Sequence, residues 1–117
     1  MKKYFTIMAI AGSIFFFANC GPSKKATASV APKVNYETNV QTLIMAHCSP
    51  CHIPSKGGNK RAYDNYANVK TDIDEIIRRI ELEPSARGFM PFKKPAKLSD
   101  STIAVFKQWK ADGMLEK

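Results

Sequence analysis

From Asn35 onward, hydrophobic residues recur with a period close to 3.6, the spacing that places side chains on one face of a helix. No segment shows the two-residue alternation of a half-buried strand, and no internal repeat is present. The buried face of the first predicted helix consists of Tyr36, Val40, Leu43, Ile44 and His47. The pattern predicts an all-α fold.

A second predicted helix follows the same spacing. Its buried face consists of Ile73, Ile76, Ile77 and Ile80. We expect this helix to stop before Pro84, because proline has no amide proton with which to continue the hydrogen bonds of a helix. A shorter helix is predicted over residues 62–69.

The third predicted helix begins at Ser99, whose hydroxyl is suited to cap the first turn. Leu98 can pack back onto this helix, and the negative charge of Asp100 suits its N-terminus. The buried stripe consists of Ile103, Phe106 and either Trp109 or Lys110. Gly113 is well placed to end the helix.

The first residues have the layout of an export signal. Lys2 and Lys3 precede an uncharged apolar stretch over residues 4–18, which is short for a membrane span of about 20 residues. An uncleaved N-terminal anchor is the alternative interpretation. Residues 17–21 read Phe-Ala-Asn-Cys-Gly and resemble a bacterial lipoprotein cleavage box, in which the cysteine becomes the first mature residue and carries a lipid.

That resemblance divides the chain into three parts. We expect residues 1–19 to be a signal peptide of the lipoprotein type and Cys20 to be the lipidation site. Residues 20–34 combine small residues, prolines and lysines, a composition typical of a flexible tether. The folded domain is then predicted over residues 35–117.

Length and charge narrow the possibilities only partly. The 117 residues have room for one domain, in which the irregular segments 53–60 and 84–97 would be loose unless something held them. The 18 Lys and Arg against 10 Asp and Glu give a net charge of +8, which suits nucleic acid, anionic lipid or an acidic protein. Export makes nucleic acid an unsuitable partner. Three cysteines are an odd number, so one disulfide framework does not explain them all.

Residues 48–52 read Cys-Ser-Pro-Cys-His, the Cys-x-x-Cys-His signature of c-type haem attachment. The thiols of Cys48 and Cys51 can add to the two vinyl groups of a haem, and the next residue, His52, then supplies an axial imidazole to the iron. Covalent attachment requires an oxidising compartment outside the cytoplasm, in agreement with the export signal. One haem held between the two irregular segments would also order them.

Three other interpretations use the same residues. A thioredoxin-like dithiol belongs to an α/β pattern that this sequence lacks. A structural zinc site needs four ligands, and only His47 could join Cys48, Cys51 and His52. A disulfide between the two cysteines would close a very small loop and gain little stability. We favour haem attachment.

Residues 35–117 resemble the small monohaem cytochromes c. A helix that leads into Cys-x-x-Cys-His, a Met-Pro pair in a later loop, and a final helix near a Trp and a Gly occur in that order. The resemblance implies that Met90, which precedes Pro91, is the second axial ligand opposite His52. The sequence departs from the family at Val40, where many members carry glycine, and no Gly-Pro pair follows the haem motif.

The resemblance implies a domain of three to four helices wrapped around one covalent haem. A His/Met iron has no vacant position, so the expected function is one-electron transfer as a carrier and not as an enzyme. The expected protein is a monomer on the periplasmic side of a bacterial membrane, where the lipid on Cys20 anchors it. A haem-based gas or redox sensor, or a ligand-binding domain, with an open distal position is the alternative. An accessory domain that supplies electrons to one enzyme is a third interpretation.

Basic residues follow the haem motif and surround Met90. They are Lys56, Lys60, Arg61, Arg87, Lys93, Lys94 and Lys97. We expect them to form a basic rim that steers a redox partner with an acidic docking surface. A solvated basic surface without a partner is the alternative.

Overall fold

The computed structural model describes residues 32–117. This part of the chain is helical, and within it the only β-type contact is an isolated bridge between Asn35 and Leu115. The predicted all-α class is therefore confirmed for these residues. The predicted signal peptide and Cys20 lie outside the described residues and stay predictions.

The first helical segment begins with a π-helical turn, Tyr36–Val40, and continues as helix α1, Gln41–His47. The side chain of Asn35 caps the turn, since its Oδ1 accepts a hydrogen bond from the Thr38 amide at 3.0 Å. Tyr36, Val40 and Ile44 are buried, as the spacing predicts. The opening turn is wider than the α-helix we expected, because the Gln41 amide bonds the carbonyl of Tyr36 five residues earlier.

Helix α2, Tyr66–Glu81, is longer than expected and replaces the short helix predicted over residues 62–69. That prediction is wrong because Asn65 starts a new helix, with its Oδ1 accepting a hydrogen bond from the Asn68 amide at 3.0 Å. The backbone amide of Tyr63 donates its hydrogen bond to the His52 carbonyl and not to a carbonyl of a helix. Of the predicted isoleucine face, Ile73, Ile76 and Ile80 are buried and Ile77 is half-buried, and the helix ends before Pro84.

Helix α3, Asp100–Ala111, forms as predicted. The hydroxyl of Ser99 accepts a hydrogen bond from the Thr102 amide at 3.2 Å. Trp109 is fully buried and Lys110 is exposed, which settles the choice for the buried stripe. Gly113 follows the helix with a φ of +90°, a conformation that favours glycine.

The core lies where the first helical segment and α2 meet α3. Tyr36, Tyr66 and Trp109 pack as an aromatic group with ring centroids 5.7 to 6.2 Å apart. The indole nitrogen of Trp109 donates to the Leu115 carbonyl at 2.8 Å, and the Tyr36 amide donates to the same carbonyl at 2.9 Å. These bonds tie the two ends of the domain together. Val40 is fully buried, and its turn contacts α3.

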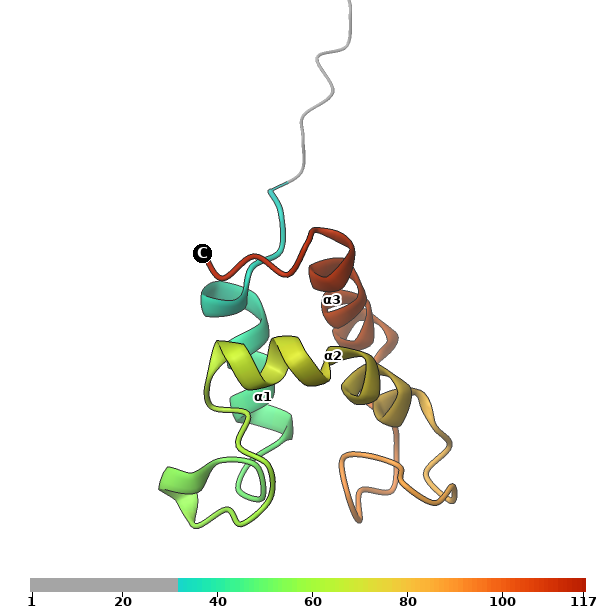
Figure 1. The fold of residues 1–117 in the computed structure, drawn as a ribbon. Coiled ribbons are helices and arrows are strands. Elements are labelled where there is room, and N and C mark those ends of the chain that lie inside the picture. The colour runs from blue at the N-terminus through green and yellow to red at the C-terminus, as the bar shows by residue number, and fades with distance from the viewer. Residues whose placement is uncertain (1–31) are drawn as a thin grey trace, which may run out of the picture. The chain divides into compact units, whose positions relative to one another are not determined.

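Two loops leave the helices at the same end of the fold, away from the C-terminus (Figure 1). The first loop, residues 48–65, connects α1 to α2, and the second loop, residues 82–99, connects α2 to α3. Cys48 and Met90, one from each loop, pack against the same hydrophobic core. Within residues 32–117, no helix has both the length and the apolar character needed to cross a membrane.

Candidate functional site

The Cys-x-x-Cys-His segment forms a tight turn at the end of α1. The amide of Cys48 donates to Ile44 at 2.8 Å and closes the helix, and the amide of His52 donates back to the Cys48 carbonyl at 3.0 Å. Cys48 is half-buried and Cys51 is exposed, and neither forms a disulfide. Both thiols are therefore available for a covalent bond.

Gly58 allows the first loop to fold back onto this turn. A Cβ atom at Gly58 would lie 2.3 Å from the carbonyl oxygen of Pro50 and 2.6 Å from that of Cys51. The amides of Gly58 and Lys60 donate to Ile53 at 3.1 Å and to Cys51 at 3.0 Å. The fully buried side chain of Ile53 anchors the turn in the core. The sequence shows the glycine, but the close approach that requires it is visible only in the fold.

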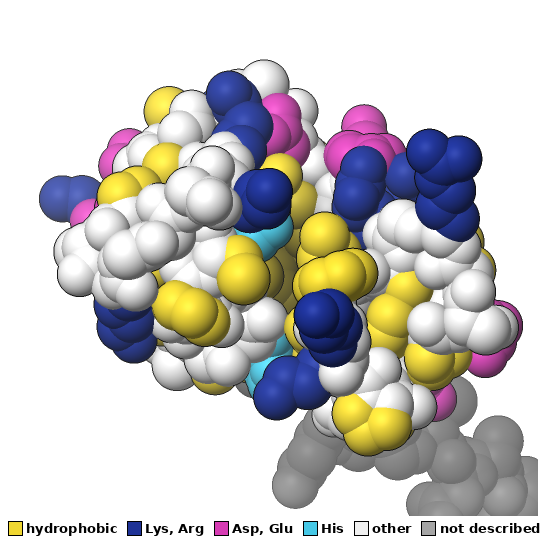
Figure 2. Space-filling view, turned by 90° about the horizontal axis from the view of Figure 1, so that it is seen from below, with side chains coloured by type: hydrophobic (Ala, Val, Ile, Leu, Met, Phe, Trp, Pro, Cys, Tyr) yellow, Lys and Arg dark blue, Asp and Glu magenta, His cyan; other side chains and the backbone are white. Residues whose placement is uncertain are grey.

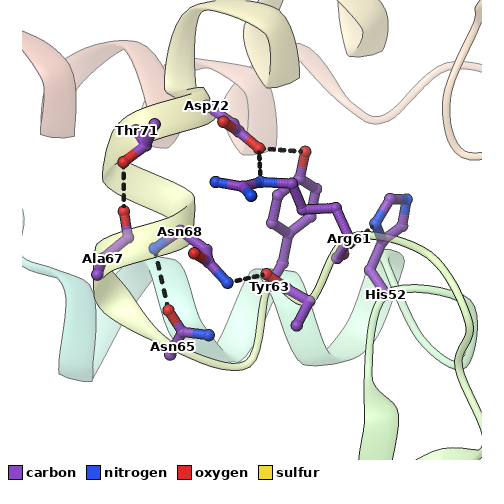
Figure 3. A network of polar contacts seen from close by, with 9 residues as sticks. His52, Arg61, Tyr63, Asn65, Ala67, Asn68, Thr71 and Asp72 are labelled. Atoms are coloured by element: carbon purple, nitrogen blue, oxygen red, sulfur yellow. Dashed lines mark hydrogen bonds and ion pairs between the residues drawn. The ribbon is translucent and has the colours of Figure 1, made fainter.

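The imidazole of His52 is held on its edge and on its face (Figure 3). Its Nδ1 lies 2.8 Å from the carbonyl oxygen of Arg61. A carbonyl oxygen can only accept, so this contact places a proton on Nδ1, and in the neutral imidazole Nε2 is then the nitrogen with the lone pair. The Tyr63 ring stacks on the imidazole with centroids 4.6 Å apart and an interplanar angle of 8°. A histidine that donates one nitrogen to a backbone carbonyl is the usual arrangement of a metal ligand.

A second layer of contacts lies behind the histidine. The Asp72 carboxylate, on α2, accepts from Arg61 Nε and from the Tyr63 hydroxyl, the latter at 3.2 Å. Burial raises the pKa of Tyr63 to about 12, and the nearby Asp72 charge acts in the same direction. We did not predict this layer from the sequence, because its members share no motif and no helical spacing.

The environment of Cys48 differs from that of a redox-active dithiol. Burial raises the pKa of its thiol to about 11, whereas nucleophilic cysteines have a lowered pKa. The zinc interpretation lacks a matching geometry as well. In the range 32–117, His, Cys, Asp and Glu side chains do not gather in any group of three that could hold a metal ion.

Met90 lies in the second loop beside an open pocket. Its amide donates to the Arg79 carbonyl at 3.2 Å, its neighbour Phe89 is buried, and Met90 itself is half-buried. The pocket has a volume of about 630 Å³ and is lined by the end of α2 and the second loop, including Phe89, Met90 and Phe92. His52 is not part of its lining. The structure therefore brings both loops to one end, while the pairing of His52 with Met90 stays a prediction.

The end of the molecule that carries the two loops is hollowed (Figure 2). Hydrophobic side chains line the hollow, and histidine and basic side chains lie beside it (Figure 2). Two of the expected rim residues are paired with acids, Arg61 with Asp72 and Lys97 with Glu83. Lys93 lies over the exposed ring of Phe92 at 5.4 Å.

Comparison with protein families, with curated proteins and with solved structures found no match for this chain. A covalently attached haem fits three features of the site: two thiols without a disulfide partner, an imidazole whose Nδ1 is held by a backbone carbonyl, and an apolar hollow. The residues that would hold it are Cys48, Cys51 and His52, with Met90 as the candidate second ligand.

Proposed function

We propose that residues 35–117 form a c-type cytochrome domain that carries one covalent haem and transfers single electrons. The observation that carries this proposal is the state of His52. The hydrogen bond from Nδ1 to the Arg61 carbonyl directs Nε2 toward the role of a metal ligand, in the same five-residue segment as two free thiols. A dithiol would not require this orientation of the imidazole, and within residues 32–117 no group of three His, Cys, Asp or Glu side chains could complete a zinc site.

The protein side chains have separate tasks in this proposal. Cys48 and Cys51 would hold the cofactor covalently, and His52 would bind its iron. Met90 would be the second ligand and would favour the reduced state, since a thioether ligand raises the reduction potential. The cofactor supplies the one-electron chemistry. The hydrophobic side chains that line the hollow would exclude water from the cofactor.

The proposed setting follows from the sequence. The chain is exported, and a lipid on Cys20 holds the domain on the periplasmic side of a bacterial membrane. Its partners are redox proteins with acidic docking surfaces, attracted by the exposed cations Arg87, Lys93 and Lys94 of the second loop.

A second candidate function is a sensor or ligand-binding domain with a vacant distal position. In that case the thioether of Met90, which lines the pocket, would not bind the iron. Carbon monoxide separates the two functions, because it binds ferrous haem only where a coordination position is free. We expect the reduced wild-type protein not to bind carbon monoxide.

The matched variants for this test are Met90→Leu and Met45→Leu, which replace two half-buried methionines with a residue of similar size. Loss of the Met90 thioether should open the distal position, so that Met90→Leu binds carbon monoxide and has a lower reduction potential. Met45→Leu should behave as the wild type. Carbon monoxide binding by the wild type, unchanged in Met90→Leu, would support the sensor and refute the carrier.

A further inference from the structure

Asp72 connects α2 to both residues that contact the His52 imidazole (Figure 3). One of its carboxylate oxygens accepts from Arg61 Nε and from the Tyr63 hydroxyl. Asp72 is 20 positions from His52 in the sequence and does not touch it. The haem motif therefore does not account for this carboxylate.

Each contact of Asp72 constrains the imidazole in a different way. Arg61 presents its backbone carbonyl to Nδ1 at 2.8 Å, and the ion pair between its side chain and Asp72 holds that residue against α2. The Tyr63 ring covers the imidazole face. The backbone amide of Tyr63 donates a hydrogen bond to the His52 carbonyl at 2.8 Å, and its hydroxyl donates one to Asp72. Rotation of the imidazole would break the first contact and collide with the second.

The burial of these groups indicates what the ion pair contributes. The Asp72 side chain is 22% exposed and that of Arg61 is 50% exposed, so water screens the pair and its contribution to stability is small. The ion pair can still decide the orientation of the imidazole, because the groups that hydrogen-bond to a metal-binding histidine and pack against it set its ring plane and its tautomer.

The geometry points to Asp72 as a positioning residue that, through Arg61 and Tyr63, sets the ring plane and the Nδ1–H tautomer of the His52 imidazole. This inference rests on the proposed function, because the consequence of a fixed ring plane appears at the iron. Asp72 thereby links the rigid helix α2 to the axial ligand, which lies in a loop.

The test compares Asp72→Asn with Asp74→Asn in the haem-bearing protein. Both variants make the same change on α2, but Asp74 is exposed and pairs with Lys110 on α3. Two signals report on His52: the spread of the haem-methyl proton shifts of the ferric protein, which follows the imidazole plane, and solvent exchange of the Nδ1 proton in the ferrous protein.

We expect Asp72→Asn to change the pattern of methyl shifts and to accelerate Nδ1 proton exchange at least about fivefold, the effect of weakening one hydrogen bond. Asp74→Asn should match the wild type in both signals. Tyr63→Phe, which keeps the stacked ring and removes its bond to Asp72, should change the signals in the same direction to a smaller extent. It also tests the inference if Asp72→Asn does not fold.

The possible failures are distinguishable. A haem protein in which both Asp72→Asn and Tyr63→Phe give the wild-type signals would overturn the role of Asp72 and leave the proposed function standing. A wild-type protein without covalent haem would overturn the proposed function and this inference with it.

Discussion

The two loops at the open end of the molecule are built differently, although both carry proposed ligands. The first loop is held throughout its length, by main-chain bonds around Gly58, by the buried Ile53 and by the side chain of Asp72. The second loop is held mainly near its middle, where Phe89 is buried and the Met90 amide donates a hydrogen bond to the Arg79 carbonyl of α2. Its next aromatic residue, Phe92, is 66% exposed.

The difference assigns separate roles to the loops. In the first loop, contacts within the protein already orient the imidazole of His52, the proposed ligand. The second loop has fewer contacts and lines an open pocket beside Met90. If the proposed haem is attached, the first loop would determine its position, and the less constrained second loop would be the one that adjusts to it.

The largest expected effect concerns the anchor of the second loop. Phe89→Ala should lower the free energy of unfolding by about 3 kcal/mol, the usual cost of removing a buried aromatic ring. Phe92→Ala, a few residues along the same loop, should change it by less than about 0.5 kcal/mol, because that ring is mostly exposed. Denaturant unfolding of both variants measures the difference, and equal effects would contradict the anchoring role of Phe89.

Gly58→Ala should lower the free energy of unfolding by about 2 kcal/mol, because the added Cβ would meet two backbone oxygens of the Cys-x-x-Cys-His turn. Gly57→Ala is the matched control, since its Cβ would meet nothing within 4 Å and only its φ of +80° is unfavourable. We expect the yield of attached haem to fall more in Gly58→Ala. A larger loss in Gly57→Ala would show that the loop does not pack as described.

Tyr63→Phe should have an effect that depends on pH. At pH 7 the variant loses the bond to Asp72 and should be about 1 kcal/mol less stable. An unfolded tyrosine ionises near pH 10, while folded Tyr63 keeps its proton to about pH 12, so the wild type loses stability as the pH rises between these values. The variant lacks this loss, and the stability gap should narrow above about pH 10. A gap that is constant from pH 7 to 11 would contradict the raised pKa.

The smallest expected effect concerns charge at the second loop. The double variant Lys93→Glu and Lys94→Glu should slow reduction by an acidic redox partner a few-fold at low salt, and the difference should vanish at high salt. Lys117→Glu is the control, because it changes charge at the C-terminus, which Figure 1 shows far from the loops. Unchanged reduction rates in the double variant would exclude electrostatic steering.

Local patterns in the sequence predict the helices well. The isoleucine stripe of α2, the Ser99 cap and the Gly113 end of α3 each depend on residues within a few positions of one another. The start of α2 could have been found from Asn65, an amide side chain directly before a helical run. The π-helical turn at Tyr36–Val40 has no comparable signal.

The candidate site could be predicted only in part. Cys48, Cys51 and His52 form a motif and are recognisable, whereas the contacts that orient His52 are not. Asp72 meets Arg61 and Tyr63 across separations of 11 and 9 residues, along a loop whose path follows no period. Such contacts depend on how the loop returns to α2, which is a property of the folded chain.

The most direct test of the central claim is the haem content of the full chain made together with haem-attachment machinery and then denatured. We predict one haem per chain that stays bound after denaturation, with a spectrum typical of two thioether bonds. Cys48→Ala and Cys51→Ala should each give the spectrum of a single thioether bond. Absence of haem, or haem that separates from the denatured chain, would contradict the account.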